Sequence, residues 1–502
     1  MPAETTTRDG IGAAPAHAAP VIAPERRVLI FIAALASVFI TQIESTIVAT
    51  AMPTIVGEIG GFELLSWVFT VYLLTQAVTT PLYGRLSDLY GRKPILLFGI
   101  GLFIAGSVMC GLAWDMPSLI LFRAIQGFGA GAISPVGRTL IGDIYHGADR
   151  ARMQGWVSGV FIGAAVLGPV VGAFLVAHTI WQMVFWVNVP LGLIAGAILI
   201  LVLKEHFERR RARIDIGGSL LLAAGSFILL YALAQSAMLP TLWFAGLIAL
   251  AVLVLAGFAL FERTAAEPIW PMSLWRDRMS TSGNFVSLTL GAAIMGVTAY
   301  LPVYVQGVMG KSAMTAGLII MTMSASSPIA AVLAGRIMLR TSYRVSASIG
   351  GLFFIAGTVM MAMLTTTSGP LFVMAGGLLI GFGLGLNNNT YMVAIQAESG
   401  WNMRGVATGV FIFARILGQA LGAAAFGGIL NAGLSRYLQG EGDLLTRILT
   451  PEQRATLPPE TLAPLMQEFA HSLHIVFVIL AGLAVATLAV GYLLPKGRSL
   501  RR

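Results

Sequence analysis

Long apolar runs recur along nearly the whole chain, from about residue 28 to residue 494. Each run of about 20 residues is long enough, as a helix, to cross a bilayer core of roughly 30 Å. Backbone groups inside hydrocarbon must be hydrogen-bonded without water, so only helices or a closed barrel can span a membrane. The strands of a barrel alternate in polarity, and these runs do not. The chain is therefore predicted to be an all-α membrane protein.

Fourteen runs are long enough, so we predict fourteen transmembrane helices. They lie near residues 28–51, 62–83, 94–114, 117–138, 153–177, 184–203, 216–236, 241–261, 283–306, 314–335, 345–365, 370–394, 406–430 and 472–494.

The composition excludes a soluble protein of this length. Of the 502 residues, 57% are hydrophobic and only 11% are charged, which is too few to cover a water-exposed surface. The net charge of +9 would also suit a protein that binds nucleic acid. The excess lies in short loops between the apolar runs, however, as in membrane proteins whose basic loops face the cytoplasm. We therefore expect no nucleic-acid partner.

The placement of basic residues predicts the orientation. With the N-terminus in the cytoplasm, most of the 31 Lys and Arg residues fall in loops or tails on the cytoplasmic side. Four fall on the other side: Lys311, Arg436, Arg447 and Arg454. This asymmetry favours an even number of spans with both termini cytoplasmic. We place the chain in the cytoplasmic (inner) membrane, in contact with its lipids, as a monomer.

The sequence has none of the residue patterns of a reaction centre. No His/Cys cluster has the spacing of metal ligands, and no nucleophile–base set stands out. The single cysteine, Cys110, excludes an intramolecular disulfide. The glycine-rich runs 127–131 and 381–385 lie inside spans and lack the strand–turn–helix context of a phosphate loop. We predict no cofactor and no enzymatic activity.

Two related stretches indicate an internal repeat. Gly84–Lys93 follows the second span, and a weaker copy, Gly335–Arg340, follows the tenth. If the last six spans repeat the first six, the seventh and eighth are an insertion. The loop before the last span contains Thr450-Pro451-Glu452, which predicts the start of a short helix. The predicted parts are a disordered cytoplasmic tail (1–25), an N-terminal six-helix bundle (26–203), two inserted helices (204–264), a C-terminal six-helix bundle (265–496) with an outside loop (431–470), and a cytoplasmic tail (497–502).

Three stretches of the sequence carry a family resemblance. Gly84–Lys93 resembles the cytoplasmic signature of the major facilitator superfamily, and residues 123–131 resemble its proton-linked motif. Residues 44–53 resemble the first-span motif of the fourteen-span drug:proton antiporters, which usually have Asp where this chain has Glu44. The resemblance covers residues 28 to 494. It implies a major facilitator fold, with two six-helix bundles plus two inserted helices, and multidrug efflux as the activity.

The fifth span resembles the antiporter motif of this family. The family often has two adjacent glycines where this chain has Gly172-Ala173. The resemblance implies that this span packs against the partner half, at the tenth span, near Ser326-Ser327-Pro328. The residues of the motif are Gly159, Gly163, Gly168, Pro169 and Gly172.

The resemblance also implies a conformational latch on the cytoplasmic side. Asp88 would lie near the start of the thirteenth span, where the positive helix end and Arg404 would attract it and hold the outward-open state. The alternative is a solvated loop acid. The residues assigned to the latch are Gly84, Asp88, Gly91, Arg92, Lys93 and Arg404.

Glu44 is the only carboxylate deep within a predicted span. An ionised carboxylate there is costly, so it should be paired, hydrated or protonated. Arg123, in the fourth span, falls at a similar depth by helix geometry. We predict that Glu44 carries the coupled proton and that Arg123, which cannot release one, tunes it. The alternative is a permanent structural ion pair between the first and fourth spans.

Other polar residues in apolar spans are candidates for a substrate cavity. Arg415 has no acidic residue in nearby spans and could attract an anionic substrate group or be a satisfied structural arginine. The amides could line the cavity or simply link helices. Tyr300, like Tyr72, offers an aromatic face to a lipophilic or cationic ligand or packs in the core. The candidates are Gln76, Gln126, Asn188, Asn284, Tyr300, Gln306, Asn387, Asn388, Gln396 and Arg415.

These observations predict a proton-coupled antiporter that exports small lipophilic drugs or toxic compounds, cationic ones included, by alternating access. Two alternatives with the same fold are an exporter of lipids or glycolipids and a proton symporter that imports an organic anion bound at Arg415. A sensor or scaffold without transport would need large soluble domains, and the sequence contains none.

Overall fold

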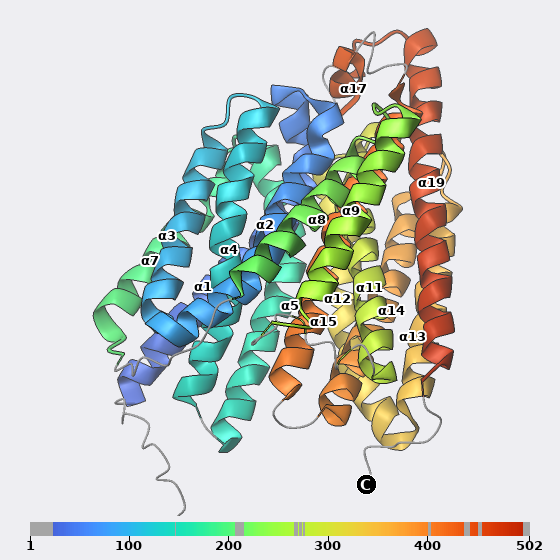
Figure 1. The fold of residues 1–502 in the computed structure, drawn as a ribbon. Helices are drawn as coiled ribbons and strands as arrows, with labels where there is room; N and C mark the ends of the chain where they lie inside the picture. The colour runs from blue at the N-terminus through green and yellow to red at the C-terminus, as the bar shows by residue number, and fades with distance from the viewer. Residues whose placement is uncertain are drawn as a thin grey trace, which may run out of the picture.

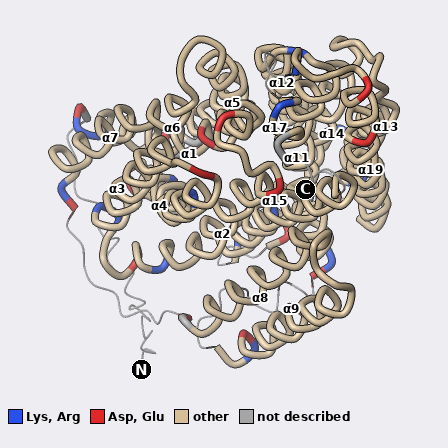
Figure 2. The backbone as a smooth tube through the Cα atoms, turned by 90° about the horizontal axis from the view of Figure 1, so that it is seen from above, with Lys and Arg blue, Asp and Glu red and all other residues tan. Residues whose placement is uncertain are grey.

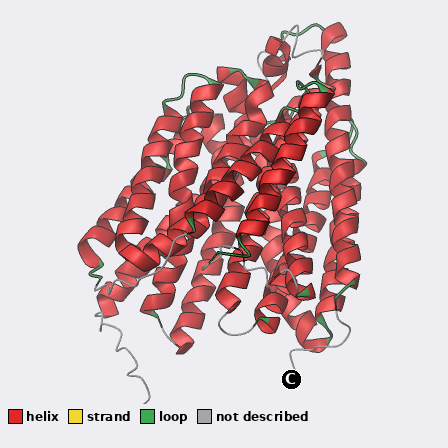
Figure 3. Ribbon diagram, in the orientation of Figure 1, coloured by secondary structure: helices red, strands yellow, loops and turns green. Residues whose placement is uncertain are grey.

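The structure, a computed structural model, describes residues 24–145, 147–205, 215–265, 277–399, 403–435, 442–449 and 454–494, together with Trp270 and Leu274. Within these ranges the chain is helical and has no strand (Figure 3). Fourteen helices of the described part are long and apolar enough to cross a membrane, which confirms the predicted all-α membrane fold. The predicted helix start at Thr450-Pro451-Glu452 and nearly all of both tails lie outside the described residues.

The helices run back and forth along the molecule (Figure 1). The helices are α1 (Pro24–Ile59), η1 (Phe62–Leu64), α2 (Leu65–Tyr90), α3 (Arg92–Gly111), α4 (Met116–Ile144), α5 (Gly147–His178), α6 (Met183–Trp186), α7 (Asn188–Val202), α8 (Ile216–Ala234), α9 (Thr241–Phe261), α11 (Arg278–Val303), η2 (Tyr304–Val308), α12 (Ala313–Arg340), α13 (Tyr343–Ala362), α14 (Pro370–Glu398), α15 (Arg404–Gly433), α17 (Gly442–Leu449) and α19 (Pro459–Tyr492).

Several helices extend well beyond the predicted spans. The last span was predicted from residue 472, but α19 begins at Pro459, and α4 continues past residue 138 to Ile144. Hydropathy marks only the part of a helix that lies in hydrocarbon, whereas the helix continues into the polar region as long as its backbone bonds are made. Pro459 suits a helix start, because its missing N–H would have no partner in the first turn.

Side-chain caps stop these helices from fraying where the chain leaves the apolar region. Asp115 accepts a hydrogen bond from the Ser118 backbone N–H at 2.8 Å and begins α4. Hydrogen bonds from the Ser118 side chain and backbone lower the pKa of Asp115. Asp215 and Asp277 cap α8 and α11 in the same way, as Ser312 caps α12. Each cap satisfies backbone donors that have no partner inside the helix.

The long helices pack as two groups. Helices α1–α7 contact one another, as do α11–α15 and α19, whereas the short helix α17 contacts α1. In Figure 2 the two groups lie side by side, and they meet where α2 contacts α15 and α5 contacts α12. This arrangement is the one predicted for a major facilitator fold.

Helices α8 and α9 lie outside the two groups, as expected for an insertion (Figure 2). Helix α8 contacts both α2 and α15, so it lies across the line where the groups meet. Helix α9 packs on α8, and Leu242 and Trp243 near its start are largely exposed. The sequence of α9 is apolar on all sides, so the exposed faces suit contact with lipid.

Candidate functional site

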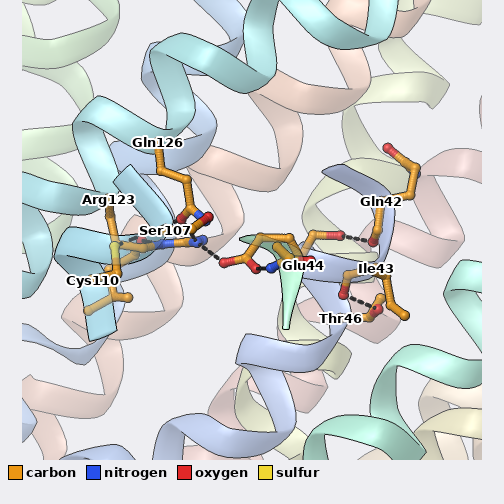
Figure 4. Close-up of polar contacts among 11 residues, drawn as sticks. Gln42, Ile43, Glu44, Thr46, Ser107, Cys110, Arg123 and Gln126 are labelled. Atoms are coloured by element: carbon orange, nitrogen blue, oxygen red, sulfur yellow. Dashed lines mark hydrogen bonds and ion pairs between the residues drawn. The ribbon is translucent and has the colours of Figure 1, made fainter. Parts of the chain in front are cut away.

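The strongest candidate site is a polar cluster buried among the helices of the first group (Figure 4). Glu44 on α1 and Arg123 on α4 are both fully buried. Arg123 Nη1 donates to Glu44 Oε1 at 2.6 Å. The structure therefore joins directly the two residues that the sequence placed at a similar depth.

Two amides complete the cluster, which we call the Glu44 cluster: Glu44, Arg123, Gln126, Ser107 and Asn188. Asn188 Nδ2, at the start of α7, donates to Glu44 Oε2. Arg123 Nη1 also donates to Gln126 Oε1 at 2.6 Å, and Gln126 Nε2 donates to Ser107 Oγ at 2.8 Å. Helices α1, α3, α4 and α7 thus meet at one hydrogen-bonded network.

The remaining contacts of Arg123 involve α2. Its Cζ lies 4.0 Å from the centre of the Tyr72 ring, and its Nε donates to the Val68 carbonyl at 3.3 Å. The Tyr72 ring therefore faces Arg123 and packs in the core, which is one of the two roles that the sequence left open. The Tyr72 hydroxyl and Asn188 Oδ1 have no hydrogen-bond partner among the described residues. Both atoms could accept a hydrogen bond if the cluster rearranged.

A buried ion pair of this kind adds little net stability, because desolvation of the two charges offsets their attraction. Removal of one partner is costly, however, since it leaves the other charge buried without compensation. Glu44 and Arg123 are held by four helices of one group, so a proton on Glu44 would change contacts throughout that group. Protonation of Glu44 would therefore change how these helices pack.

Two cavities lie where the two helix groups meet. The smaller, of about 180 Å³, is lined by residues of α1, α2, α4 and α15, and we call it the central cavity. The larger, of about 510 Å³, lies where α2 ends and α15 begins, and we call it the vestibule. Thr80, Pro135 and Gly409 line both, so the cavities adjoin. The inserted helix α8 contributes Ser219 and Leu222 to the vestibule wall.

Two of the predicted cavity residues, Gln76 and Arg415, line the central cavity. Gln126 and Asn188 do not, because their helix faces turn inward to the Glu44 cluster, where both are fully buried. Glu44 itself is also absent from the cavity wall, although its neighbour Ser45 belongs to it. Hydropathy finds a polar residue in a span but not the face from which it projects.

The other predicted cavity residues make contacts elsewhere in the structure. Tyr300 is buried and donates its hydroxyl to the Ala423 carbonyl at 2.5 Å, and Asn387 donates to its own helix at Gly383. Neither belongs to the described wall of the central cavity or the vestibule. The Tyr300 hydrogen bond joins α11 to α15, whereas the Asn387 hydrogen bond stays within α14. The assignment of both residues to a substrate cavity stays a prediction.

Three of the four remaining candidates make contacts between helices. Gln306 Nε2 donates to the Thr50 carbonyl at 3.5 Å and so joins the two groups. Asn388 Oδ1 accepts from Arg415 Nη1 at 3.5 Å, which places Asn388 next to a residue of the cavity wall. Asn284 is buried in α11, and Gln396 Nε2 donates to Thr408 Oγ1 at 3.2 Å. These four do not line either of the two described cavities.

The sequence-based search missed Arg138. The predicted fourth span ends at residue 138, so Arg138 falls at its edge and is not among the polar residues assigned to a cavity. In the structure α4 continues to Ile144, and Arg138 projects into the central cavity. The signal was available: Ile141 and Ile144 continue the helical spacing of apolar residues beyond Arg138, and both are buried.

The predicted latch residues divide between two contacts. Asp88 Oδ1 pairs with Arg92 Nη1 at 2.5 Å, and Arg92 Nε lies 3.1 Å from Asp143 Oδ2. Lys93 Nζ instead donates to the Leu203 carbonyl at 2.6 Å, so it caps the end of α7 within the first group. In this structure Lys93 therefore joins α3 to the end of α7, both in the first helix group, and makes no hydrogen bond to the described residues of the second group.

Gly91 and Gly84 differ in what they require. Gly91 has φ 98°, and a Cβ added there would lie 2.8 Å from Glu205 Oε2, so only glycine fits. A Cβ on Gly84 would meet no atom within 4 Å. Asp88 and Gly405, beside Arg404 at the start of α15, both line the vestibule. In this structure the vestibule therefore lies between Asp88 and the start of α15. A contact between them stays a prediction for a state in which the vestibule is closed.

The antiporter-motif glycines face different neighbours. A Cβ on Gly172 would lie 2.5 Å from Thr50 Oγ1 and 2.6 Å from the Ile47 carbonyl, so α5 and α1 approach closely there. Gly168 likewise meets Thr46 of α1. Gly159 and Gly163 have open space around them. Two of the four motif glycines therefore serve packing of α5 against α1, next to Glu44.

Helix α5 also packs against α12, as the resemblance implies. The close approach occurs at Gly317, where an added Cβ would lie 2.6 Å from the Pro169 carbonyl. Ser326 instead faces α14 and donates to the Leu378 carbonyl at 2.9 Å. The close contact between the groups is therefore at Gly317, about two and a half turns nearer the start of α12 than the predicted contact at Ser326.

We expect Gly172→Val to weaken the contact of α5 with α1. The added side chain must displace Thr50 or the α1 backbone, and such overpacking costs about 1–3 kcal/mol of unfolding free energy. Unfolding temperatures of the purified protein in detergent measure the effect. Gly163→Val is the matched control and should leave the temperature unchanged, because a Cβ there meets no atom within 4 Å. Equal effects of the two substitutions would contradict this packing.

Comparison with known proteins agrees with the fold. A family model described as Major Facilitator Superfamily matches residues 34–423. Multidrug resistance protein 3 of Bacillus subtilis (strain 168) is 32% identical over 78% of this chain and 77% of its own length. Multidrug transporter protein MdtP of the same organism is 31% identical over 85% of this chain and 78% of its own length.

A solved structure has the same fold at low sequence identity. It is a bacterial homolog of the human lysosomal transporter Spinster, in an inward-facing and unoccupied conformation. Its TM-score is 0.65 at 16% identity, and the match covers 94% of this chain and 97% of that one. With a family match over most of its length and the same arrangement of helices, the chain belongs to the major facilitator superfamily of membrane transporters.

Proposed function

We propose that the protein is a proton-coupled antiporter that exports small lipophilic compounds across the cytoplasmic membrane by alternating access. Both termini would be cytoplasmic, so the vestibule would open toward the cytoplasm and the structure would represent an inward-facing state. The names of the two Bacillus relatives, a multidrug resistance protein and a multidrug transporter, support export of such compounds.

The observation that carries the proposal is the buried pair of Glu44 and Arg123 beside the central cavity. Gln42 and Ser45 line the cavity, and Glu44, on the same turn of α1, points away from it toward Arg123 (Figure 4). A change at Glu44 would therefore move α1, which forms part of the substrate pathway. One helix links the ionisable group to the cavity wall.

The proposed cycle follows from these contacts. In the inward-facing state Glu44 is ionised and is held by Arg123 and Asn188. When the outer side opens, a proton binds Glu44 and neutralises it, so the attraction of Arg123 is lost. The helices of the first group then favour the return to the inward-facing state, where the proton is released as the pair re-forms. Substrate leaves on the outer side of the same cycle.

At the opposite end from the vestibule, contacts between the groups would close the outer side. Asn431 Nδ2 on α15 donates to the Glu63 carbonyl at 2.7 Å, and Gln306 joins Thr50. Separation of the groups would break these hydrogen bonds and expose the apolar faces between them, so opening needs a compensating contact elsewhere. Closure of the vestibule would bring Asp88 toward Arg404 and offset that cost.

Transport by the purified protein in sealed vesicles tests the proposal. Three lipophilic dyes are offered under an imposed pH gradient: rhodamine 6G as a cation, fluorescein as an anion and Nile red as a neutral compound. We expect gradient-driven accumulation of at least one dye, which disappears when nigericin collapses the gradient in potassium buffer. If all three dyes distribute as in protein-free vesicles, the proposal is wrong.

A further inference from the structure

The central cavity contains two arginines and no described acidic residue. Arg138 enters it from α4 in the first helix group, and Arg415 enters it from α15 in the second. The described wall contains no Asp or Glu. Each arginine keeps its charge at any physiological pH. The cavity that opens between the two groups is therefore positively charged from both sides.

Neither arginine has an ion-pair partner among the described residues, in contrast to Arg123 in the Glu44 cluster. Arg415 Nη1 has only a long hydrogen bond of 3.5 Å to Asn388 Oδ1. The guanidinium carbon of Arg138 lies 4.4 Å from the centre of the Phe161 ring. The Nε–H groups of Arg138 and Arg415 are buried and donate to no partner among the described residues. Such donors are costly to bury unless an acceptor reaches them.

The rest of the wall determines what kind of acceptor would fit. Ile412, Ile416 and Leu73 present apolar surface, while Gln76 and Gln419 present amides. An apolar body with one charged end would match this combination. A carboxylate, sulfonate or phosphate between the arginines would accept hydrogen bonds from both guanidinium groups, which hold such groups in two-point contacts.

We infer that the central cavity selects lipophilic substrates that carry an anionic group, which binds between Arg138 and Arg415. The inference rests on the proposed function only in taking this cavity as the substrate pathway. Because the two arginines come from opposite helix groups, a bound anion contacts both groups and draws them together. A cationic drug, which the sequence alone allowed, would meet two charges of its own sign.

Equilibrium binding without a pH gradient tests the inference. The purified protein in phosphatidylcholine nanodiscs is titrated with tritiated 2-naphthylacetic acid and with its neutral amide. The acid should bind more tightly than the amide. Arg138→Gln and Arg415→Gln should each weaken binding of the acid about tenfold, as for loss of one charge-assisted hydrogen bond, and leave the amide unchanged. Nanodiscs that contain phosphatidylglycerol distinguish the source of the anion, since a lipid headgroup in the cavity would compete with the acid.

The controls separate charge from packing. Arg138→Lys and Arg415→Lys keep the charge and should keep most of the preference for the acid. Arg263→Gln removes an exposed charge after α9 and should change nothing. Unchanged binding of the amide shows that each variant is folded.

The outcomes also separate this inference from the proposed function. Equal affinity for acid and amide, no saturable binding of the acid, or full affinity of the Arg138→Gln/Arg415→Gln double variant would overturn the inference. Dye transport in vesicles would still support export in that case. Arginine-dependent binding of the acid without gradient-driven transport would support the inference and remove the proposed proton coupling.

Discussion

Replacement of Glu44 by Gln should abolish transport driven by a pH gradient, while the protein still binds substrate. Glutamine has nearly the same shape and can still accept from Arg123 Nη1, which now lies 2.6 Å from the carboxylate. It cannot bind and release a proton. The cavity wall contains Ser45 and Gln42 but not Glu44, so the binding surface is preserved. Vesicle transport and equilibrium binding of the same dye measure the two properties.

Glu58→Gln is the control for this substitution. Glu58 lies on the same helix near its end, is exposed, and belongs to neither described cavity. This variant should transport as the wild type does. Gradient-driven transport by Glu44→Gln at the wild-type rate would contradict the assigned role and leave Glu44 as a structural partner of Arg123.

Replacement of Arg123 by Gln should destabilise the protein strongly. It leaves the Glu44 carboxylate fully buried with Asn188 as its remaining donor. An uncompensated buried charge of this kind costs about 3–5 kcal/mol of unfolding free energy. The loss of the contact between Arg123 and the Tyr72 ring adds a smaller amount. Unfolding of the purified protein in mixed micelles measures the difference.

The double variant Glu44→Gln/Arg123→Gln makes this prediction specific. It removes both charges, so most of the stability lost in Arg123→Gln should return. Transport should remain absent, because no group at this site can carry a proton. Additive losses of stability in the double variant would mean that the two residues act independently, despite the 2.6 Å contact.

The fold could be predicted from the sequence because it depends on the length and hydrophobicity of each segment, which do not depend on the other segments. An apolar run of about 20 residues must cross the bilayer as a helix whatever its neighbours are. The depth of Glu44 and Arg123 was likewise accessible, since helix rise converts residue number into distance. The motifs imply a fold in which the first and fourth helices are adjacent. The one thing that the sequence did not show is that the two side chains project toward each other.

The members of the cavity wall could not be predicted in the same way. Asn188 and Gln126 are polar residues in apolar spans, as Gln76 is, yet the first two point into the Glu44 cluster and the third into the cavity. A rotation of about 100° separates neighbouring residues on a helix, and apolar spans buried on most sides give little signal for that rotation. Arg138 was missed for a related reason, because hydropathy underestimates the length of α4.

Proton release on substrate binding tests the central claim most directly. Purified protein in weakly buffered detergent solution receives the dye that the vesicle assay shows to be carried, and a pH indicator records the change. If substrate and proton compete through Glu44, the wild type should release up to about one proton per bound dye at a pH where Glu44 is partly protonated. Glu44→Gln should bind the dye and release none. Equal proton release by the wild type and Glu44→Gln would contradict the claim that Glu44 carries the coupled proton.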